Sequence, residues 1–387
     1  MMPSGRSRVV AVLLAAVVAP VFAQQKAKPA ETECAPGRGP AIDAADLRAR
    51  DPDAPLAVPR NASLLGPLDR ALLCPGLGDE TPCIMPGPVQ LACARIGLPL
   101  ELRHIVVTGD LNLPGASLDA GLRLEDVQVL GSLNLAGAKI SAELVLDRVL
   151  VNGTLNLDEA RVEGKAAARD LRVLGPLSLS GATLARALEI QGSLVAGELD
   201  LSPDNVAAVS VGGTSVLGDL TLSGVEVAGD IALDQVGVRG SVDSLELEVG
   251  GEVTLSGVTA ADGISLSGRF AKGLELADCR TEGDLELFDA EIKGPLTIGT
   301  TRVAGELFLS GSKLARAMKI EGSEIVEGVD LGDSVLSDEL VLIGSRFGAP
   351  VDASLARLAM APRVVACTPA DPLAAEDDDE DEGAEEP

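Results

Sequence analysis

The sequence between Gly109 and Gly348 repeats every eleven residues, as its first part, GDLNLPGASLDAGLRLEDVQVLGSLNLAGAKIS, already shows. If the first apolar residue of each unit is taken as its anchor, 22 anchors run from Leu111 to Leu340. One residue is missing before Val209 and another before Leu274. All 22 anchors are apolar, and the residue two positions later is apolar in every unit except that of Ser244.

Each unit alternates apolar and polar residues, which places its apolar side chains on one face of a short strand. This spacing does not fit the 3.6-residue period of a helix. Neighbouring units also differ: GDLNLPGASL and GSLNLAGAKI carry Ala where the intervening AGLRLEDVQV carries Val. Two units therefore form one coil of 22 residues. The sequence predicts an all-β fold, a right-handed parallel β-helix (β-solenoid) of about eleven coils over residues 109–348.

The segments that flank the repeat differ from it in composition. Residues 24–108 hold four of the six cysteines and many of the prolines, and they predict a small N-terminal cap. Short helices are expected in this cap at 44–50, 63–73 and 88–98, between Pro-rich turns. Residues 349–370 are expected to form a thinner C-terminal cap, because the open end of a solenoid needs cover.

The two extremities of the chain predict a signal peptide and a tail. Residues 1–23 combine Arg6 and Arg8, a short apolar run and small residues before Gln24, which is typical of a cleaved secretory signal. We therefore expect export to a periplasmic or extracellular location, with no transmembrane segment after cleavage. Residues 371–387 contain ten acidic residues and no basic one, which predicts a disordered acidic tail.

Charge and composition exclude several classes of function. The formal net charge of −28 repels phosphates, so no nucleic-acid partner is expected. Five Phe, no Trp and no Tyr leave almost no aromatic platforms for sugars or single-stranded nucleic acids.

The units LNLAGAKI, LSLSGATL and LTLSGVEV resemble the pentapeptide-repeat proteins, and the resemblance covers about Gly109 to Gly348. It implies a four-sided right-handed β-helix. Steps of five residues alternate here with steps of six, giving 22 residues per coil where the family pattern gives 20. The cross-section is therefore expected to be a loosened square or closer to a triangle.

No motif for catalysis, a cofactor or a metal is present. His104 is the only histidine, and ELRHIVV offers it only Glu101 as a nearby carboxylate, so we interpret it as a polar residue between cap and rod. We expect no catalytic residue, no cofactor and no metal.

The six cysteines predict different environments. Cys34, Cys74, Cys83 and Cys93 lie in one exported segment and predict disulfides, with Cys74–Cys83 as the first choice. A zinc site is the alternative. Cys279 is expected to be a buried thiol, whereas Cys367 is expected to be free or paired in the C-terminal cap.

A row of outward polar residues recurs once per coil. It is interpreted as a solvated face, with recognition of a partner as the alternative. Its members are Asn112, Asn134, Asn156, Ser178 and Asp200.

Three functions follow as hypotheses. The first is an exported, non-catalytic rod with a structural or protein-interaction role, whose partner is an unknown protein or envelope component and whose ends associate with one another. The second is a parallel β-helix that acts on or binds polysaccharide, and the third is an acidic DNA mimic of the pentapeptide-repeat kind.

Overall fold

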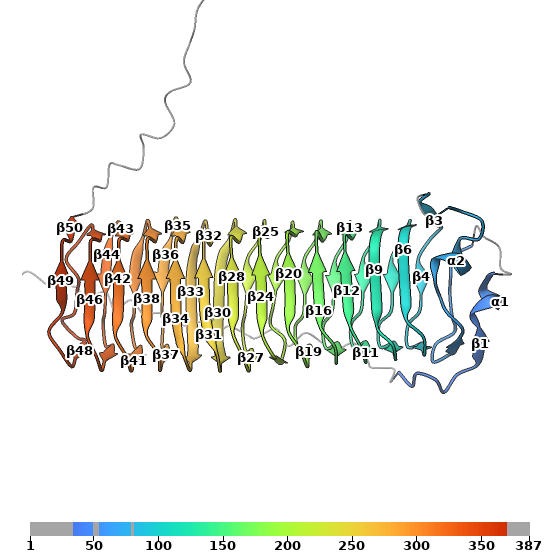
Figure 1. Cartoon of the computed structure of the whole chain (residues 1–387), viewed down its shortest axis with the longest axis horizontal. Helices are drawn as coiled ribbons and strands as arrows, with labels where there is room; N and C mark the ends of the chain where they lie inside the picture. The colour runs from blue at the N-terminus through green and yellow to red at the C-terminus, as the bar shows by residue number, and fades with distance from the viewer. Residues whose placement is uncertain (1–33, 49–53, 79–80, 370–387) are drawn as a thin grey trace, which may run out of the picture. The chain divides into compact units, whose positions relative to one another are not determined.

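The computed structural model describes residues 34–48, 54–78 and 81–369. The signal peptide predicted at 1–23 and the acidic tail predicted at 371–387 lie outside the described residues. The described residues form an all-parallel β-solenoid of about fourteen turns (Figure 1). The predicted fold class is confirmed.

Strands stack in register at a spacing of one coil, because the sequence repeats its apolar positions at that distance. Leu133, for example, pairs with Leu111 on one side and with Leu155 on the other. Each coil contributes to four such stacks, which we call ladders 1 to 4 in the order in which the chain visits them. Four ladders give the solenoid a four-sided cross-section.

The strands of ladders 1 and 2 share one sheet, and β30 and β33 belong to both ladders. Ladder 1 holds β4 (Val89–Gln90), β7 (Leu111–Asn112), β10 (Leu133–Asn134), β14 (Leu155–Asn156), β18 (Leu177–Ser178), β22 (Leu199–Asp200), β26 (Leu220–Thr221), β30 (Ser241–Val249), β33 (Gly263–Phe270), β36 (Asp284–Glu286), β40 (Glu306–Phe308) and β44 (Gly328–Asp330). Ladder 2 holds, besides β30 and β33, β1 (Ala41–Asp43), β2 (Ser63–Leu65), β5 (Arg95–Ile96), β8 (Ser117–Leu118), β11 (Lys139–Ile140), β15 (Arg161–Val162), β19 (Thr183–Leu184), β23 (Asn205–Val206), β27 (Glu226–Val227), β37 (Glu291–Ile292), β41 (Lys313–Leu314), β45 (Val335–Leu336) and β48 (Arg357–Leu358).

Ladders 3 and 4 share the other sheet, and β6 and β9 belong to both. Ladder 3 holds β6 (Leu100–Val107), β9 (Leu122–Val129), β12 (Leu144–Asp147), β16 (Ala166–Arg169), β20 (Leu188–Gln191), β24 (Val209–Gly212), β28 (Ile231–Asp234), β31 (Glu252–Ser256), β34 (Gly273–Ala277), β38 (Leu296–Gly299), β42 (Met318–Glu321), β46 (Leu340–Ile343) and β49 (Arg363–Val365). Ladder 4 holds, besides β6 and β9, β3 (Cys83–Met85), β13 (Leu150–Val151), β17 (Arg172–Val173), β21 (Leu194–Val195), β25 (Ser215–Val216), β29 (Gly237–Val238), β32 (Thr259–Ala260), β35 (Arg280–Thr281), β39 (Arg302–Val303), β43 (Glu324–Ile325), β47 (Arg346–Phe347) and β50 (Thr368–Pro369).

The core is one continuous column of inward side chains along the solenoid. Inward residues such as Leu111, Leu113 and Leu118 have no exposed surface at all. Each fully buried Leu or Val contributes about 1.5–3 kcal/mol relative to exposure, so the column is the main source of stability. Neighbouring coils share this column, which makes the stability a sum over adjacent turns.

The predicted number of coils was too low, because coils extend into both end segments. On ladder 2, β1 pairs with β2 and β2 pairs with β5, within the segment predicted as a cap. At the other end, β48, β49 and β50 add another turn. The 22-residue period is interrupted in the N-terminal segment, because Ser63 and Arg95, although paired, are 32 residues apart.

Two of the three helices predicted in the N-terminal segment exist in shortened form. They are α1 (Ala44–Arg48) and α2 (Arg70–Leu73), and α2 begins at the N-cap Asp69, whose Oδ1 accepts a 2.9 Å hydrogen bond from Leu72 N. The helix predicted at 88–98 is wrong, because this stretch forms β4 and β5. Its apolar residues continue the inward pattern of the coil, and pairing with β7 and β8 outweighs local helix propensity.

Candidate functional site

The predicted polar row stacks along ladder 1. Asn112, Asn134, Asn156, Ser178 and Asp200 follow one another in register. Their oxygens serve the turns: Asn134 Oδ1 accepts from Ala136 N at 2.9 Å, and Asp200 Oδ1 from Ser202 N at 3.0 Å. These side chains are half-buried, and some of their oxygens already accept hydrogen bonds from backbone N–H groups of their own coils. Recognition of a partner by this row stays a prediction.

His104 lies at the corner between ladders 3 and 4, in the left-handed backbone region with φ 51°. Its Nε2 is 3.3 Å from Asp126 Oδ2, and Arg148 binds the same carboxylate at 2.6 Å. The hydrogen bond from Arg148 is the main cause that lowers the pKa of Asp126 below its ordinary value. Glu101 instead lies 3.5 Å from Arg103. The histidine is therefore part of an exposed ion-pair corner.

The cysteines of the N-terminal segment form two disulfides. Cys74 pairs with Cys83, as predicted, and Cys34 pairs with Cys93. Because these pairs engage all four thiols, the structure favours the disulfide prediction over zinc. Across the described ranges of the chain, no three His, Cys, Asp or Glu side chains gather in a way that could hold a metal ion.

The two remaining cysteines differ in exposure. Cys279 is buried, as predicted, and burial raises the pKa of its thiol, which keeps it protonated and unreactive. Cys367 is free and half-buried on the last coil, which is the first of the two predicted alternatives.

The pairing of strands is irregular at the corner between ladders 1 and 2 at β33. In the preceding coils seven positions separate the inward residues, as from Val242 to Val249, but only six separate Ile264 from Phe270. The neighbouring coils turn this corner at Glu246 (φ 56°) and Asp289 (φ 48°). At the same corner of the β33 coil, none of residues 264–267 has a positive φ. The residue missing before Leu274 is therefore the corner residue itself.

The deletion changes how β30 pairs with β33. Ser244 pairs with Leu266 and Leu247 pairs with Gly268, so the register shifts between them. Leu245 and Glu246 have no partners across the deletion. Leu245 is 56% exposed, and Phe288, one coil beyond β33, is 50% exposed. A notch thus opens between two protruding corners.

Two residues adapt the backbone to this deletion. The buried Ser267 N donates a 3.1 Å hydrogen bond to Ser244 Oγ. This explains why Ser244 is the one polar residue among the second inward positions. Gly268 has φ 141°, and a Cβ there would lie 2.0 Å from Leu247 O. Only glycine fits this approach of two backbones.

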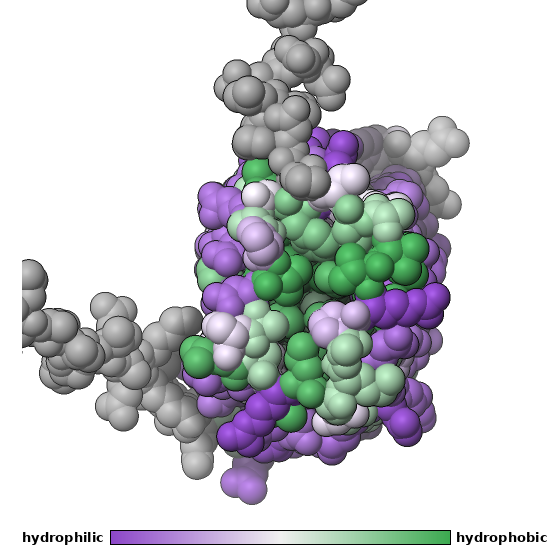
Figure 2. Space-filling model, turned by 90° about the vertical axis from the view of Figure 1, so that its left-hand side faces the viewer, coloured by the Kyte–Doolittle hydropathy of each residue, from purple (hydrophilic) through white to green (hydrophobic). Residues whose placement is uncertain are grey.

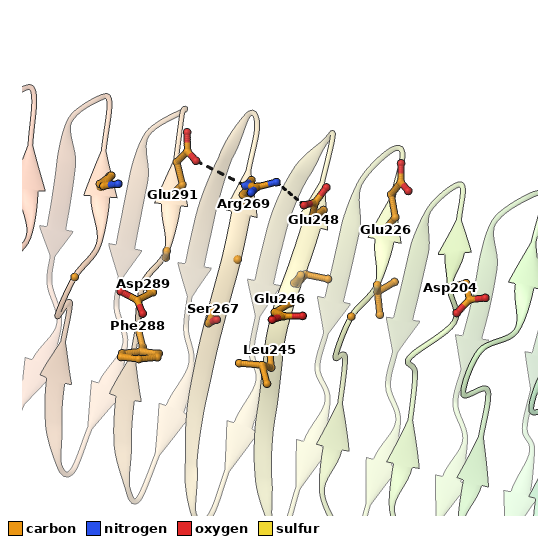
Figure 3. A pocket seen from close by; sticks show the side chains of 17 residues that line it. Asp204, Glu226, Leu245, Glu246, Glu248, Ser267, Arg269, Phe288, Asp289 and Glu291 are labelled. Carbon is orange, nitrogen blue, oxygen red and sulfur yellow. Dashed lines mark hydrogen bonds and ion pairs between the residues drawn. The ribbon is translucent and has the colours of Figure 1, made fainter. Parts of the chain in front are cut away.

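The notch continues into an open groove of about 770 Å³ that runs along the corner (Figure 3). Leu245 and Phe288 lie on either side of Ser267, and the charged side chains lie along the same corner. Arg269 Nη1 binds Glu248 Oε1 at 2.6 Å, and its Nε is 3.9 Å from Glu291 Oε2. The charged lining residues are Asp204, Glu226, Glu246, Glu248, Asp289 and Glu291 on the acidic side and Arg269 and Lys313 on the basic side.

The groove has the character of a binding surface. Six carboxylates face two cations there, and Arg269 already neutralises part of two of them, so the net charge is negative. It combines this charge with two exposed apolar side chains, a combination that accepts a basic and apolar ligand. None of the groove's residues was singled out as a site residue from the sequence. The missing residue before Leu274 and the polar Ser244 were the signals that could have found it.

No protein-family model, no curated protein and no solved structure matches this chain. In the part of the chain that the structure describes, none of the helices has the length and apolar character needed to cross a bilayer. The two disulfides are compatible with a protein that matures in an oxidising compartment.

Proposed function

We propose that the protein is an exported, non-catalytic scaffold whose solenoid holds a partner protein at the notched corner. The observation that carries this proposal is the deletion at β33, which leaves Leu245 and Phe288 exposed above a negatively charged groove. Single exposed apolar side chains are normal on a protein surface, but Leu245 and Phe288 on either side of a notch form a cluster. The partner would be an unknown protein or envelope component.

The chemistry of the groove specifies the partner segment. Glu246 and Asp289 protrude beside the two apolar side chains, and neither has an ion-pair partner among the described residues. A complementary segment would place an apolar side chain in the notch and a Lys or Arg on each side of it. Such charge complementarity acts mainly on specificity and association rate, whereas the apolar contact supplies affinity.

Support for export comes from the two disulfides together with the predicted signal peptide. The four-ladder coil also supports the resemblance to pentapeptide-repeat proteins, whose coils are two residues shorter. The polysaccharide and DNA-mimic alternatives gain no specific observation. The groove offers a sugar only one aromatic ring, that of Phe288.

Site-specific photo-crosslinking tests the proposal. The full-length protein would carry p-benzoylphenylalanine at position 245 in the cell that produces it. The matched control carries the same group at Leu174, which is 51% exposed in a coil without a deletion. We expect a discrete protein adduct from position 245 and none from 174. Equal adducts at both positions, or none at 245, would contradict the proposal.

Two further variants connect the adduct to the notch. Replacing Glu246 and Asp289 together by Lys should reduce the adduct at least about fivefold, because the partner's cations would meet like charges. Inserting one Asn after Ser267 restores the missing corner residue, fills the notch and should remove the adduct. An adduct insensitive to both changes would place the contact elsewhere.

A further inference from the structure

The C-terminal end of the solenoid is an open coil. Its strands β48, β49 and β50 each pair with the preceding coil on one side. Val364 takes the inward position of Leu342 but is 57% exposed, whereas Leu342 is 4% exposed. Other inward side chains of this coil are only half-buried: Val351, Ala353, Ala356, Leu358 and Cys367. Figure 2 shows this end face with apolar residues in the middle and polar residues around them.

The N-terminal end is closed at ladder 3, although β1 and β3 there also pair with a strand on one side only. Helix α2 takes the ladder 3 position next to β6, where Asp69 bridges to Glu101, and helices satisfy their own backbone hydrogen bonds. The buried Arg70 donates hydrogen bonds to Arg103 O at 3.1 Å and to His104 O at 2.6 Å, which fixes α2 to the next coil. Both disulfides crosslink this end. An incoming coil therefore finds no complete set of strand edges there.

We propose that the C-terminal end face binds the same face of a second copy of this chain, so that two solenoids join tail to tail. A two-fold axis perpendicular to the solenoid makes the strands of the two last coils antiparallel. The open edge of β49 can then pair with an open edge of the second copy, and the exposed inward side chains meet. Because the N-terminal end is closed, the association stops at a dimer and does not continue into a filament.

The size of the interface and the charge of the tails should both weaken this dimer. Only the last coil of each copy would contribute to the interface, whereas standard stable interfaces bury ~800 Å² per partner, so the dimer should be weak. The described chain ends at β50 on this same coil, and the ten acidic residues of 371–387 follow at once. Two such tails start beside one joint and repel each other. Salt should therefore strengthen the dimer, since it screens this repulsion.

Sedimentation velocity of the exported chain, residues 24–387, tests the proposal at about 1–200 µM protein, first in ~20 mM and then in ~500 mM NaCl, concentrations that bracket the screening range. We expect a monomer–dimer equilibrium at least about tenfold tighter in high salt. A variant whose ten tail carboxylates are replaced by their amides should dimerise equally well at both salt concentrations. Val364→Asp should abolish the dimer. The matched control Ile84→Asp, at a 68% exposed apolar residue of the closed end, should leave it intact.

Hydrogen exchange gives a second measurement that needs no variant. The amides of β49 should gain protection as protein concentration rises, while those of β1 should not. Protection of β49 that is independent of concentration would show that another segment covers the end, and this overturns the proposal. A monomer under every condition, a dimer that survives Val364→Asp, or a series of larger oligomers would overturn it as well.

Discussion

Two of the coils that depart from the repeat differ from it in contrasting ways. The coil of β16 keeps its length and its full register with β12 and β20, but it carries Ala166 and Ala168 at inward positions where its neighbours carry Leu or Ile. This leaves a cavity of about 30 Å³ lined by core side chains. The coil of β33 keeps large inward residues but lacks a corner residue, and the result is a groove on the surface.

The difference shows that side-chain volume determines the packing of the interior, whereas the number of backbone residues determines the shape of the corners. Lost side-chain volume leaves a void inside, because the stacked backbones hold the coil open. A lost backbone residue cannot be absorbed inside, because each inward residue must stay in register with the coils on both sides. The shortening therefore appears at the corner, where the chain faces solvent. A missing backbone residue therefore changes the surface, where a binding site can form, whereas missing side-chain volume changes only the interior.

The largest expected effect comes from Gly268→Ala in the deleted corner. Its Cβ would collide with Leu247 O, so we expect a loss of about 3 kcal/mol in the free energy of unfolding. Urea denaturation followed by far-UV circular dichroism is suitable, since the chain has no Trp or Tyr to report by fluorescence. Gly299→Ala is the control, because a Cβ there meets nothing within 4 Å. Equal effects at both positions would mean that the corner is not constrained.

Ser244→Ala should have the next largest effect. It leaves the buried Ser267 N–H without its acceptor, at a cost of about 2 kcal/mol. Ser244→Thr keeps a hydroxyl and should recover part of this loss. The control Ser265→Ala removes an outward, half-buried hydroxyl from the same pair of strands and should change stability by less than about 0.5 kcal/mol. If Ser244→Ala is neutral, the corner amide has another acceptor.

Ala168→Val should act in the opposite direction, in the coil with the cavity. Two added carbons fill part of the void and should stabilise the protein by about 1 kcal/mol. Ala167→Val, on the outward side of the same strand, should be close to neutral. Destabilisation by Ala168→Val would show that the coils around the cavity cannot accommodate the extra volume, and the contrast between the two departures would then weaken.

The smallest effect is expected in a coil with neither departure. Burial, followed by the charges of Asp330 and Asp284, raises the pKa of Glu306 above its ordinary value. The ionised carboxylate therefore opposes folding at neutral pH, and this penalty disappears as the pH falls below the unfolded pKa. Glu306→Gln should stabilise the protein at pH 7 by a few tenths of a kcal/mol at roughly surface-charge strength.

The pH dependence of this difference is the decisive part of the Glu306 test. At about pH 3.5, below the ordinary glutamate pKa, the variant and the parent protein should have the same stability, because Glu306 is then largely protonated in both states. Glu275→Gln, at an exposed carboxylate of ladder 3, is the control at both pH values. A difference that persists in acid would indicate a packing effect of the substitution.

The inward pattern made most of the fold predictable. Every anchor from Leu111 to Leu340 is apolar, and this regularity predicted the strands, the 22-residue coil and the stacked row of Asn112, Asn134 and Asn156. The N-terminal coils were missed because the insertion that carries α2 lengthens one coil to 32 residues. Periodicity cannot detect a coil whose length occurs once.

The site was less predictable, although its signals are in the sequence. The missing residue before Leu274 and the polar Ser244 appear there as two separate irregularities. Only the structure shows that they are one feature, because Ser267 and Ser244 lie 23 residues apart in the chain and come within hydrogen-bonding distance across adjacent coils. In the periodic pattern, such residues are two separate exceptions, and the pattern does not show that they are neighbours.

The sequence by itself determined the solenoid, its coil length and the Cys74–Cys83 disulfide, because each depends on spacing along the chain. The tertiary structure alone decided where the deletion emerges, which side chains it exposes and which end of the solenoid is closed. These depend on how each coil fits against the next, and stacking in register fixes the interior so firmly that irregularities must come out at the corners and the ends.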